Sequence, residues 1–330
     1  MKIFPIKVEK ATKADYKFIE WKIHNVCNHN CSFCGTQHKD GSQRWFSLEK
    51  YKEYTDKLVE ACGDMPFWIQ ITGGEPTLYP DLIPLLAYMK SKGAMISMIS
   101  NGSRTIRWWK ELQELKLMDN LFLTYHSEQT NDYHHVTEVA NLFHTEATEV
   151  ICLITHVYDT LDTAFEAQQY LIENTGATIT VKAMMGDQAI YSKYTTEEIT
   201  KLKSENWLPG KRKDTKVKSL LDPKYKINHT LKITYNNDIS FNIEPQLLMK
   251  QQKNKFLGWD CNIGSFTMRI DHDVIYRGVC EQGEKRSIYD NISFVDNYIP
   301  CTIEQCFCGT DMIATKILPE SMYPNENSTN

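Results

Sequence analysis

The stretch YKFIEWKIHNVCNHNCSFC, residues 16–34, decides the fold of this sequence. Its first half mixes β-branched and aromatic residues, which is typical of a strand, and leads directly into Cys27, Cys31 and Cys34. A second apolar run, FWIQIT at 67–72, ends in two glycines and is typical of a buried parallel strand. The sequence therefore predicts two strands that are each followed at once by a loop of unusual composition.

Strand and helix patterns continue to alternate on the C-terminal side of these two loops. Strands are expected near residues 18, 69, 97, 123, 152 and 180. Helices are expected over residues 47–62, 81–93, 108–117, 132–146 and 163–176. This order predicts an α/β fold in which parallel strands form a partial (β/α)6 barrel. In such folds the chemistry lies at the C-terminal ends of the strands, which is where the cysteine loop and the glycine loop both fall.

The pattern changes after residue 187. A polar helix-like piece at 195–207 is followed by a lysine-rich connector at 210–218. Two hairpin patterns follow, at 231–243 and at 265–280. We therefore expect a barrel domain with its connector over residues 1–210. A smaller α+β region is expected over residues 211–330, with a disordered tail from residue 321.

Composition narrows the class of protein. The 330 residues are 42% hydrophobic and 24% charged, with a formal net charge of -5, so a nucleic acid is an unlikely partner. The sequence shows neither a secretory signal pattern nor an apolar run of membrane-spanning length. We therefore expect a cytoplasmic protein without a membrane partner.

The ten cysteines gather in two groups, and this suits metal sites better than disulfides in a reducing compartment. Three lie between residues 27 and 34 and five between residues 261 and 308. Cys62 and Cys152 stand apart, at a helix end and in an apolar strand, where we expect them to be buried and inert. The distribution predicts two metal sites.

The CxxxCxxC spacing of the first group has a specific chemical meaning. Three thiolates hold three irons of a cubane cluster and leave the fourth iron without a protein ligand. A zinc site usually needs four protein ligands. His29 lies inside the loop and could supply the fourth, so the spacing alone leaves a zinc or non-catalytic site open.

The motif CNHNCSFC, with Phe33 just before its third cysteine, resembles the signature loop of the radical S-adenosylmethionine (SAM) superfamily. The resemblance extends to Gly73-Gly74-Glu75-Pro76, which in that family contacts the amino group of the methionine moiety. It implies that Cys27, Cys31 and Cys34 bind a 4Fe-4S cluster whose fourth iron binds S-adenosylmethionine. One electron from this cluster would cleave the sulfonium to give a 5'-deoxyadenosyl radical.

The same resemblance implies further cofactor-binding residues at other strand ends. Ser100 and Asn101 match the family's ribose-contact strand end. Thr124 and His126 stand where relatives have a Ser-x-Asp pattern, and the alternative is that Thr124 bonds to backbone while His126 packs in the core.

Two residues of the strand near 180 are weaker candidates for the cofactor site. Lys182 is a charge in an apolar strand, so it fits either a cofactor or substrate carboxylate or a structural salt bridge. Met184 fits either a cover for the adenine or simple core packing.

The C-terminal cysteines resemble the twitch appendix, the shortened relative of the SPASM domain, which holds one auxiliary 4Fe-4S cluster. They are Cys261, Cys280, Cys301, Cys306 and Cys308. Because five cysteines exceed four ligand positions, we take Cys261 and Cys280 as the firmer ligands and prefer Cys306 and Cys308 to Cys301. A zinc site is the alternative.

The resemblance implies a radical SAM enzyme that takes an electron from a reductant such as flavodoxin or ferredoxin. We expect it to abstract a hydrogen atom from a small molecule, in the oxidation, epimerisation or rearrangement of a sugar, cyclitol or nucleotide. Only about 20 residues precede the first strand, too few for a winged-helix leader-binding domain. Dehydrogenation, crosslinking or epimerisation of a peptide or protein side chain is therefore the alternative, and a non-catalytic iron–sulfur electron-transfer protein is the alternative from another class.

Overall fold

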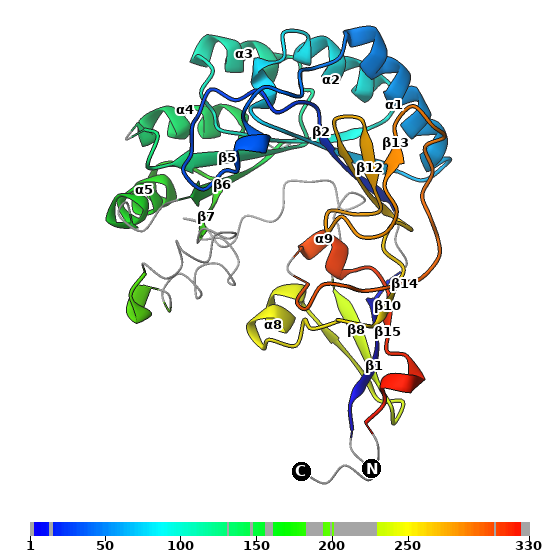
Figure 1. The fold of residues 1–330 in the computed structure, drawn as a ribbon. Helices are drawn as coiled ribbons and strands as arrows, with labels where there is room; N and C mark the ends of the chain where they lie inside the picture. Colours follow the sequence, from blue (N-terminus) through cyan, green and yellow to red (C-terminus); the bar gives the residue numbers. More distant parts are fainter. Residues whose placement is uncertain are drawn as a thin grey trace. The chain divides into compact units, whose positions relative to one another are not determined.

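The computed structural model describes residues 3–12, 16–130, 132–145, 148–155, 161–182, 194–198, 200, 230–306 and 308–324 (Figure 1). The chain divides into two compact units. Unit 1 comprises Met1–Glu20, Lys57–Phe67 and Ile227–Asn330, and unit 2 comprises Trp21–Asp56 and Trp68–Lys226. The amino-terminal residues thus group with the C-terminal third of the chain.

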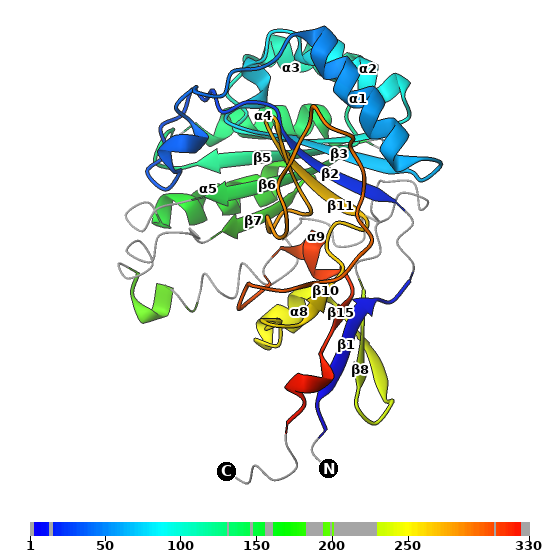
Figure 2. The ribbon, with the colours of Figure 1, turned by 45° about the vertical axis from the view of Figure 1, so that its right-hand side comes forward.

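The barrel strands follow the order β2-β3-β4-β5-β6-β7, and successive strands from β3 to β7 are paired in parallel. Unit 2 holds β4 to β7, nearly all of β3 and the last two residues of β2. Their bounds are β2 Lys17–Lys22, β3 Phe67–Thr72, β4 Met95–Ser100, β5 Asn120–His126, β6 Glu149–Thr155 and β7 Thr178–Lys182. The helices between them are α1 Leu48–Cys62, α2 Leu82–Ser91, α3 Ile106–Glu114, α4 Tyr133–Phe143 and α5 Leu161–Asn174. Figures 1 and 2 show these helices along one side of the sheet. The α/β prediction is confirmed strand by strand.

Local sequence explains where the helices begin. The Ser47 hydroxyl accepts a hydrogen bond from the Lys50 amide at 3.3 Å ahead of α1. Thr105 caps α3 through the Trp108 amide, and Asp132 caps α4 through the His135 amide. Each cap satisfies a backbone donor that the first helical turn leaves unpaired.

Unit 1 contains a six-stranded sheet in the order β14-β10-β15-β1-β8-β9. The bounds are β1 Pro5–Lys10, β8 Leu231–Tyr235, β9 Ser240–Ile243, β10 Asp260–Cys261, β14 Ile299–Pro300 and β15 Lys316–Ile317. A second set of antiparallel strands comprises β11 Thr267–Asp271, β12 Val274–Tyr276 and β13 Arg286–Ser287. The pairs β8–β9 and β11–β12 are the two hairpins that the sequence predicts.

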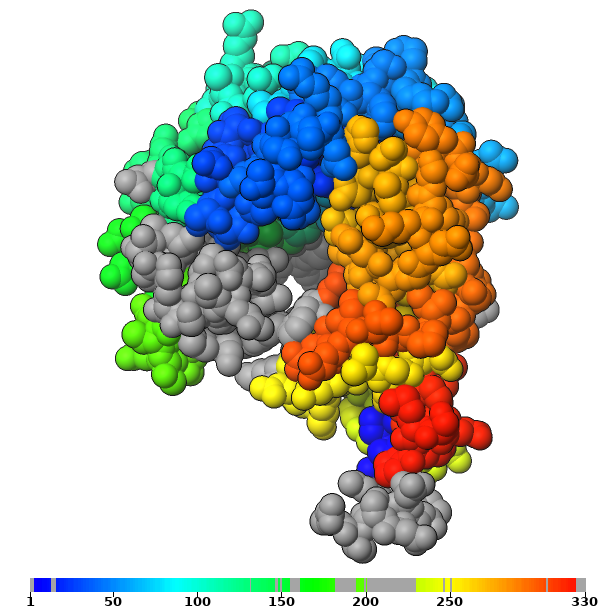
Figure 3. Space-filling model, in the orientation of Figure 1, coloured from blue at the N-terminus to red at the C-terminus, as the bar shows by residue number. Residues whose placement is uncertain are grey.

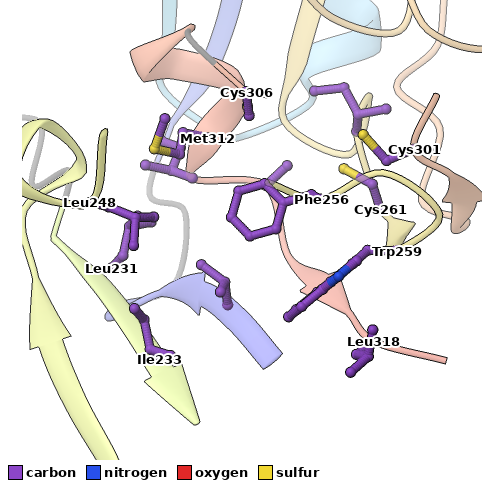
Figure 4. Packing of buried hydrophobic residues seen from close by; sticks show 14 of the residues in the cluster. Leu231, Ile233, Leu248, Phe256, Trp259, Cys261, Cys301, Cys306, Met312 and Leu318 are labelled. Atoms are coloured by element: carbon purple, nitrogen blue, oxygen red, sulfur yellow. The ribbon is translucent and has the colours of Figure 1, made fainter. Parts of the chain in front are cut away.

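The core of unit 1 packs aromatic, aliphatic and cysteine side chains together (Figure 4). Phe256 and Trp259 meet edge to face, with ring centroids 5.4 Å apart. The short helices α8 Pro245–Lys250 and α9 Gly309–Met312 contribute Leu248 and Met312. Cysteines 261, 301 and 306 belong to this cluster, so the second cysteine group is part of the folded interior.

Several predictions fall outside the described residues or at their edge. Met184, the connector 210–218 and residues 325–330 lie outside them. Within the tail predicted to be disordered, Glu320–Met322 instead forms a 3₁₀ turn. Among the helices that the structure describes, none combines the length and the apolar character that a bilayer span requires.

Candidate functional site

The loop between β2 and α1 carries Cys27, Cys31 and Cys34 and forms part of the surface of unit 2, in blue in Figure 3. The Cys31 side chain is buried, and those of Cys27 and Cys34 are half-buried. The Cys34 amide donates to the Cys31 carbonyl at 3.2 Å, so the second half of the motif turns tightly. Three soft thiol donors therefore share one short, partly covered loop, which fits the needs of an iron–sulfur cluster.

Side chains after β4 hold the amino-terminal half of this loop. The Asn101 side-chain amide donates to Asn28 Oδ1 at 3.0 Å, and Asn28 Nδ2 donates to the Ser103 hydroxyl at 2.8 Å. Asn28 lies one residue after Cys27. Its position relative to the end of β4 is thus fixed by two hydrogen bonds.

Side chains after β5 hold the other half of the loop. The Ser32 amide donates to Glu128 Oε1 at 2.7 Å, and the Asn30 amide donates to Gln129 Oε1 at 3.1 Å. These two amides flank Cys31 in the sequence. No motif marks Glu128 or Gln129 in the sequence, although their place directly after a strand end was a usable signal.

The two glycines of the second motif lie against the entry of the cysteine loop. A Cβ on Gly73, whose φ is +145°, would lie 2.3 Å from the His24 carbonyl oxygen. A Cβ on Gly74 would lie 2.2 Å from the Val26 carbonyl oxygen. Only glycine permits this approach of one backbone to another. The Gly74 amide also donates to the His24 carbonyl at 2.9 Å, so the two motifs form one structure.

Glu75 is 1% exposed, and its carboxylate accepts hydrogen bonds from the neighbouring strand end. Oε1 accepts from the Thr77 amide, from the Thr77 hydroxyl at 2.6 Å and from the Ser100 hydroxyl at 2.8 Å. Oε2 accepts from the Asn101 amide at 2.7 Å. Desolvation by burial raises the pKa of Glu75, while these donors favour the ionised form. Glu75 therefore fixes Ser100 and Asn101, and its contact with an ammonium group remains a prediction. Pro76 opens the 3₁₀ turn Pro76–Leu78.

Thr124 and His126 lie at the C-terminal end of β5. The Thr124 hydroxyl donates to the Ser100 carbonyl at 3.1 Å, which is the structural role given as its alternative. His126 Nε2 lies 3.1 Å from the same hydroxyl. The His126 ring lies 5.5 Å from the Phe33 ring and 5.8 Å from the His29 ring, centroid to centroid. His126 thus faces the cysteine loop.

Burial sets the protonation of the loop. It raises the pKa of Cys27 and Cys34, and it raises that of Cys31 to about 12. It lowers the pKa of His29, and it lowers that of His126 to about 4. In the metal-free loop the thiols are therefore protonated and the imidazoles neutral at pH 7, so a metal must displace thiol protons when it binds.

Unit 1 holds a cavity lined by all five C-terminal cysteines, which are Cys261, Cys280, Cys301, Cys306 and Cys308. Burial raises the pKa of Cys261 and Cys280, and it raises that of Cys306 to about 11. The Cys301 thiol lies 3.6 Å from the Ile303 carbonyl oxygen, to which it donates. The fold thus brings the five cysteines to one cavity, and their role as metal ligands stays a prediction.

Two charged residues, missed in the sequence, also line this cavity. The Asp311 carboxylate accepts a hydrogen bond from the Cys280 amide. Lys316 is 1% exposed, and its ammonium donates to the carbonyls of Asp311, Met312 and Ala314, each at 3.0 Å. Neither stands in a recognisable motif, so the sequence carried no signal for them.

The two candidates from the strand near 180 are not placed at the site. Lys182 is the last residue of β7 and pairs with Thr155, while its side chain is outside the described part of the chain. Met184 is also outside it. Their cofactor roles remain predictions.

Comparison with curated proteins gives similarities that cover little more than a third of this chain. A probable GTP 3',8-cyclase from Pyrobaculum aerophilum is 27% identical over 122 residues, which are 37% of this chain and 38% of that protein. A probable GTP 3',8-cyclase from Thermococcus kodakarensis is 30% identical over 117 residues, which are 35% of this chain and 37% of that protein. The matches thus span little more than a third of these curated relatives.

A solved structure extends the likeness in fold. Streptococcus suis SuiB bound to its precursor peptide SuiA superposes over 84% of this chain and 64% of that chain, with 14% identity and a TM-score of 0.52. The model of the radical SAM superfamily matches residues 21–148, which include both motifs and the strand ends that hold them. Residues 21–148 of this chain are therefore a radical SAM domain.

Proposed function

We propose that this protein is a radical SAM enzyme that cleaves S-adenosylmethionine reductively and abstracts a hydrogen atom from a small-molecule substrate. The observation that carries the proposal is the arrangement around Cys31. The amides on both sides of this cysteine are hydrogen-bonded to side chains after β5, and the GGEP backbone lies against the entry of the same loop. A 4Fe-4S cluster bound by Cys27, Cys31 and Cys34 would supply the electron for the cleavage.

The chain's own residues position the loop and the cofactor. Glu75 holds the Asn101 amide, and Asn101 in turn holds Asn28 of the cysteine loop, so the strand ends and the loop keep one geometry. The half-buried rings of Phe33 and His126 lie 5.5 Å apart, centroid to centroid, and in this proposal they help to exclude water from the loop. Fixed geometry and exclusion of water are what the protein contributes to radical chemistry.

The substrate class is proposed from the relatives. Two curated relatives are named as probable GTP 3',8-cyclases, and each matches a little more than a third of this chain. We place the substrate among nucleotides, sugars and cyclitols, with a peptide as the alternative.

Transfer of deuterium tests this class directly. Reduced, cluster-loaded protein is incubated with S-adenosylmethionine and with uniformly deuterated nucleoside triphosphates, sugar phosphates or cyclitols. The deuterium content of the 5'-deoxyadenosine is then measured by mass spectrometry. Deuterium in that product identifies the substrate and supports the proposal. Deuterium arriving only from a labelled peptide pool overturns the small-molecule class. If no 5'-deoxyadenosine forms under any condition, the proposal that the protein is a radical SAM enzyme is overturned. The alternative of a non-catalytic electron-transfer protein then remains.

We also propose that the cysteine cavity of unit 1 binds a second 4Fe-4S cluster. Five thiols line it, and the Cys301 thiol already donates to a carbonyl, which supports Cys301 as the surplus cysteine. In this proposal Cys261, Cys280, Cys306 and Cys308 are the ligands.

Metal analysis of reconstituted variants tests the second cluster. We expect about eight irons in the wild type and about four in the Cys27→Ala/Cys31→Ala/Cys34→Ala triple variant. Cys301→Ala should keep the wild-type count, and Cys280→Ala should lower it to about four. About four irons in the wild type and none in the triple variant would overturn the second cluster, and zinc in the cavity would then be its expected content.

A further inference from the structure

A group of potential metal ligands forms at the cysteine loop once the chain is folded. One ligand atom each of His29, Cys31 and His126 lies within 4.8 Å of the others. Within the described ranges, this is the only group of three or more His, Cys, Asp or Glu side chains that meets this criterion. His29 and Cys31 belong to the loop after β2, and His126 ends β5.

The two imidazoles have nitrogens available for a ligand. Nδ1 of His29 and Nδ1 of His126 are buried, and neither has a hydrogen-bond partner among the residues that the structure describes. His126 Nε2 is engaged with the Thr124 hydroxyl, which leaves Nδ1 as the free nitrogen of that ring. A buried polar atom without a partner is unfavourable, and a bound cation would satisfy both nitrogens.

The surrounding hydrogen bonds hold the three side chains together. Ser32 and Asn30, on either side of Cys31, donate to Glu128 and Gln129 just after β5. The loop is thereby tied to the strand end that carries His126. The group is thus a product of the fold and not of a flexible surface segment.

The donor set decides which ion is bound. Two imidazole nitrogens and one thiolate suit Zn²⁺, whereas Mg²⁺ and Ca²⁺ require oxygen ligands. Zinc distances of about 2.0–2.1 Å to nitrogen and about 2.3 Å to sulfur imply ligand atoms roughly 3.3–3.8 Å apart in a tetrahedron. The ligand atoms already lie within 4.8 Å of one another, so small side-chain rotations bring them into that range.

We propose that His29, Cys31 and His126 bind one Zn²⁺ in the protein that lacks its iron–sulfur cluster, with water as the fourth ligand. Cys31 releases its thiol proton to solvent when the ion binds. Cys31 is shared with the proposed cluster site, so zinc and cluster exclude each other. The zinc site itself does not depend on the proposed function, and only the exclusion does.

Zinc stoichiometry tests the site. Metal-free, reduced protein is titrated with Zn²⁺ against a colorimetric chelator, and with Co²⁺ for its thiolate absorption band. The cavity of unit 1 can also take zinc, so the readout is the difference between variants. His126→Ala should bind one equivalent less than the wild type. His134→Ala, in α4 and outside the group, should bind as the wild type does.

A conservative variant separates ligation from folding. His126→Cys removes the ring but keeps a ligand, so it should recover the equivalent that His126→Ala loses. Equal stoichiometry for the wild type and His126→Ala would overturn the proposal. Failure of His126→Cys to recover binding, with an unchanged circular dichroism spectrum, would also overturn it.

Cluster assembly tests the exclusion. Zinc-preloaded wild type should take up iron into the loop at least tenfold more slowly than zinc-free protein, and His126→Ala should show no such delay. Equal rates of iron uptake by zinc-preloaded and zinc-free wild type would show that zinc and the cluster do not exclude each other. If zinc-free protein also takes up no iron at the loop, the proposed function fails, while the difference in zinc stoichiometry still decides the zinc site.

Discussion

At Gly74 the backbone of one motif touches the backbone of the other, and a methyl group would lie 2.2 Å from the Val26 carbonyl oxygen. Neither backbone can rotate away as a side chain would. We predict that Gly74→Ala costs about 1–3 kcal/mol of stability and lowers iron uptake at the loop. Gly309→Ala is the control, because a Cβ there meets no atom within 4 Å. Urea unfolding and iron analysis of both variants check this, and a wild-type result for Gly74→Ala would contradict it.

His126 makes the stability of metal-free protein depend on pH. Burial lowers its pKa from 6.5 to about 4, because the charged ring loses hydration. The folded state therefore takes up this proton less readily than the unfolded state. The stabilisation is fully present above pH 6.5 and is lost as pH falls from 6.5 to about 4.

The His126→Gln variant isolates this contribution. Between pH 7 and pH 4 the wild type should lose about 2–3 kcal/mol more unfolding free energy than the variant, from the size of the pKa difference. Urea unfolding at several pH values measures both. Parallel pH profiles for the two proteins would show that His126 does not titrate with an altered pKa.

The candidate residues that belong to a recognisable sequence motif could be predicted from the sequence, and those outside such motifs could not. The spacing of Cys27, Cys31 and Cys34 points to a metal without any structure. The engagement of Glu75 by Ser100 and Asn101 could not be predicted, because it depends on how two neighbouring strands are aligned. The meeting of His29 with His126 depends on the same long-range alignment.

At the scale of elements, the connection from β5 to α4 also holds the cysteine loop in place through a hydrogen bond. Its Glu128 accepts the Ser32 amide of the cysteine loop at 2.7 Å. We predict that Glu128→Ala accelerates loss of loop iron to a chelator by about threefold to tenfold. A hydrogen bond to a charged acceptor contributes about 1.5–3 kcal/mol, and in the variant water replaces part of this hydrogen bond. Glu128→Gln keeps an acceptor oxygen and should fall between wild type and Glu128→Ala. Identical release rates for all three proteins would contradict this role.

Elements with a strong local pattern were predictable, and very short ones were not. The runs that form β3 and β4 are apolar on both faces, as parallel strands covered by helices are. In contrast, β10, β14 and β15 have two residues each and exist only through pairing with partners far away in the sequence. A local pattern cannot reveal such strands.

At the scale of the whole molecule, the first strand is essential to the unit that contains the cysteine cavity. β1 lies between β8 and β15, and its Val8 is 2% exposed within the core of unit 1. We predict that Val8→Asp costs at least about 3 kcal/mol, because it buries a charge in that core. The cavity cysteines should then react faster with a thiol reagent, whereas Lys7→Ala should leave their reactivity unchanged. Unaltered reactivity in Val8→Asp would contradict the place of β1 in this core.

The grouping of the chain into two units follows from this strand, and sequence order alone does not reveal it. Met1–Glu20, which include β1 and the first residues of β2, group with Ile227–Asn330. A division by position along the chain places them with the barrel. Composition shows no boundary there, because the pairing of β1 with β8 is a long-range property.

The formation of 5'-deoxyadenosine from S-adenosylmethionine tests the central claim most directly. Anaerobically reconstituted protein is reduced with dithionite, and the product is quantified for the wild type, for the Cys27→Ala/Cys31→Ala/Cys34→Ala triple variant and for Cys62→Ala. Cys62 is a buried cysteine at the end of α1, outside both cysteine groups. We predict product from the wild type and from Cys62→Ala, and a loss of at least about two orders of magnitude in the triple variant. Equal product from the triple variant and the wild type, or no product from loaded and reduced wild type, would contradict it.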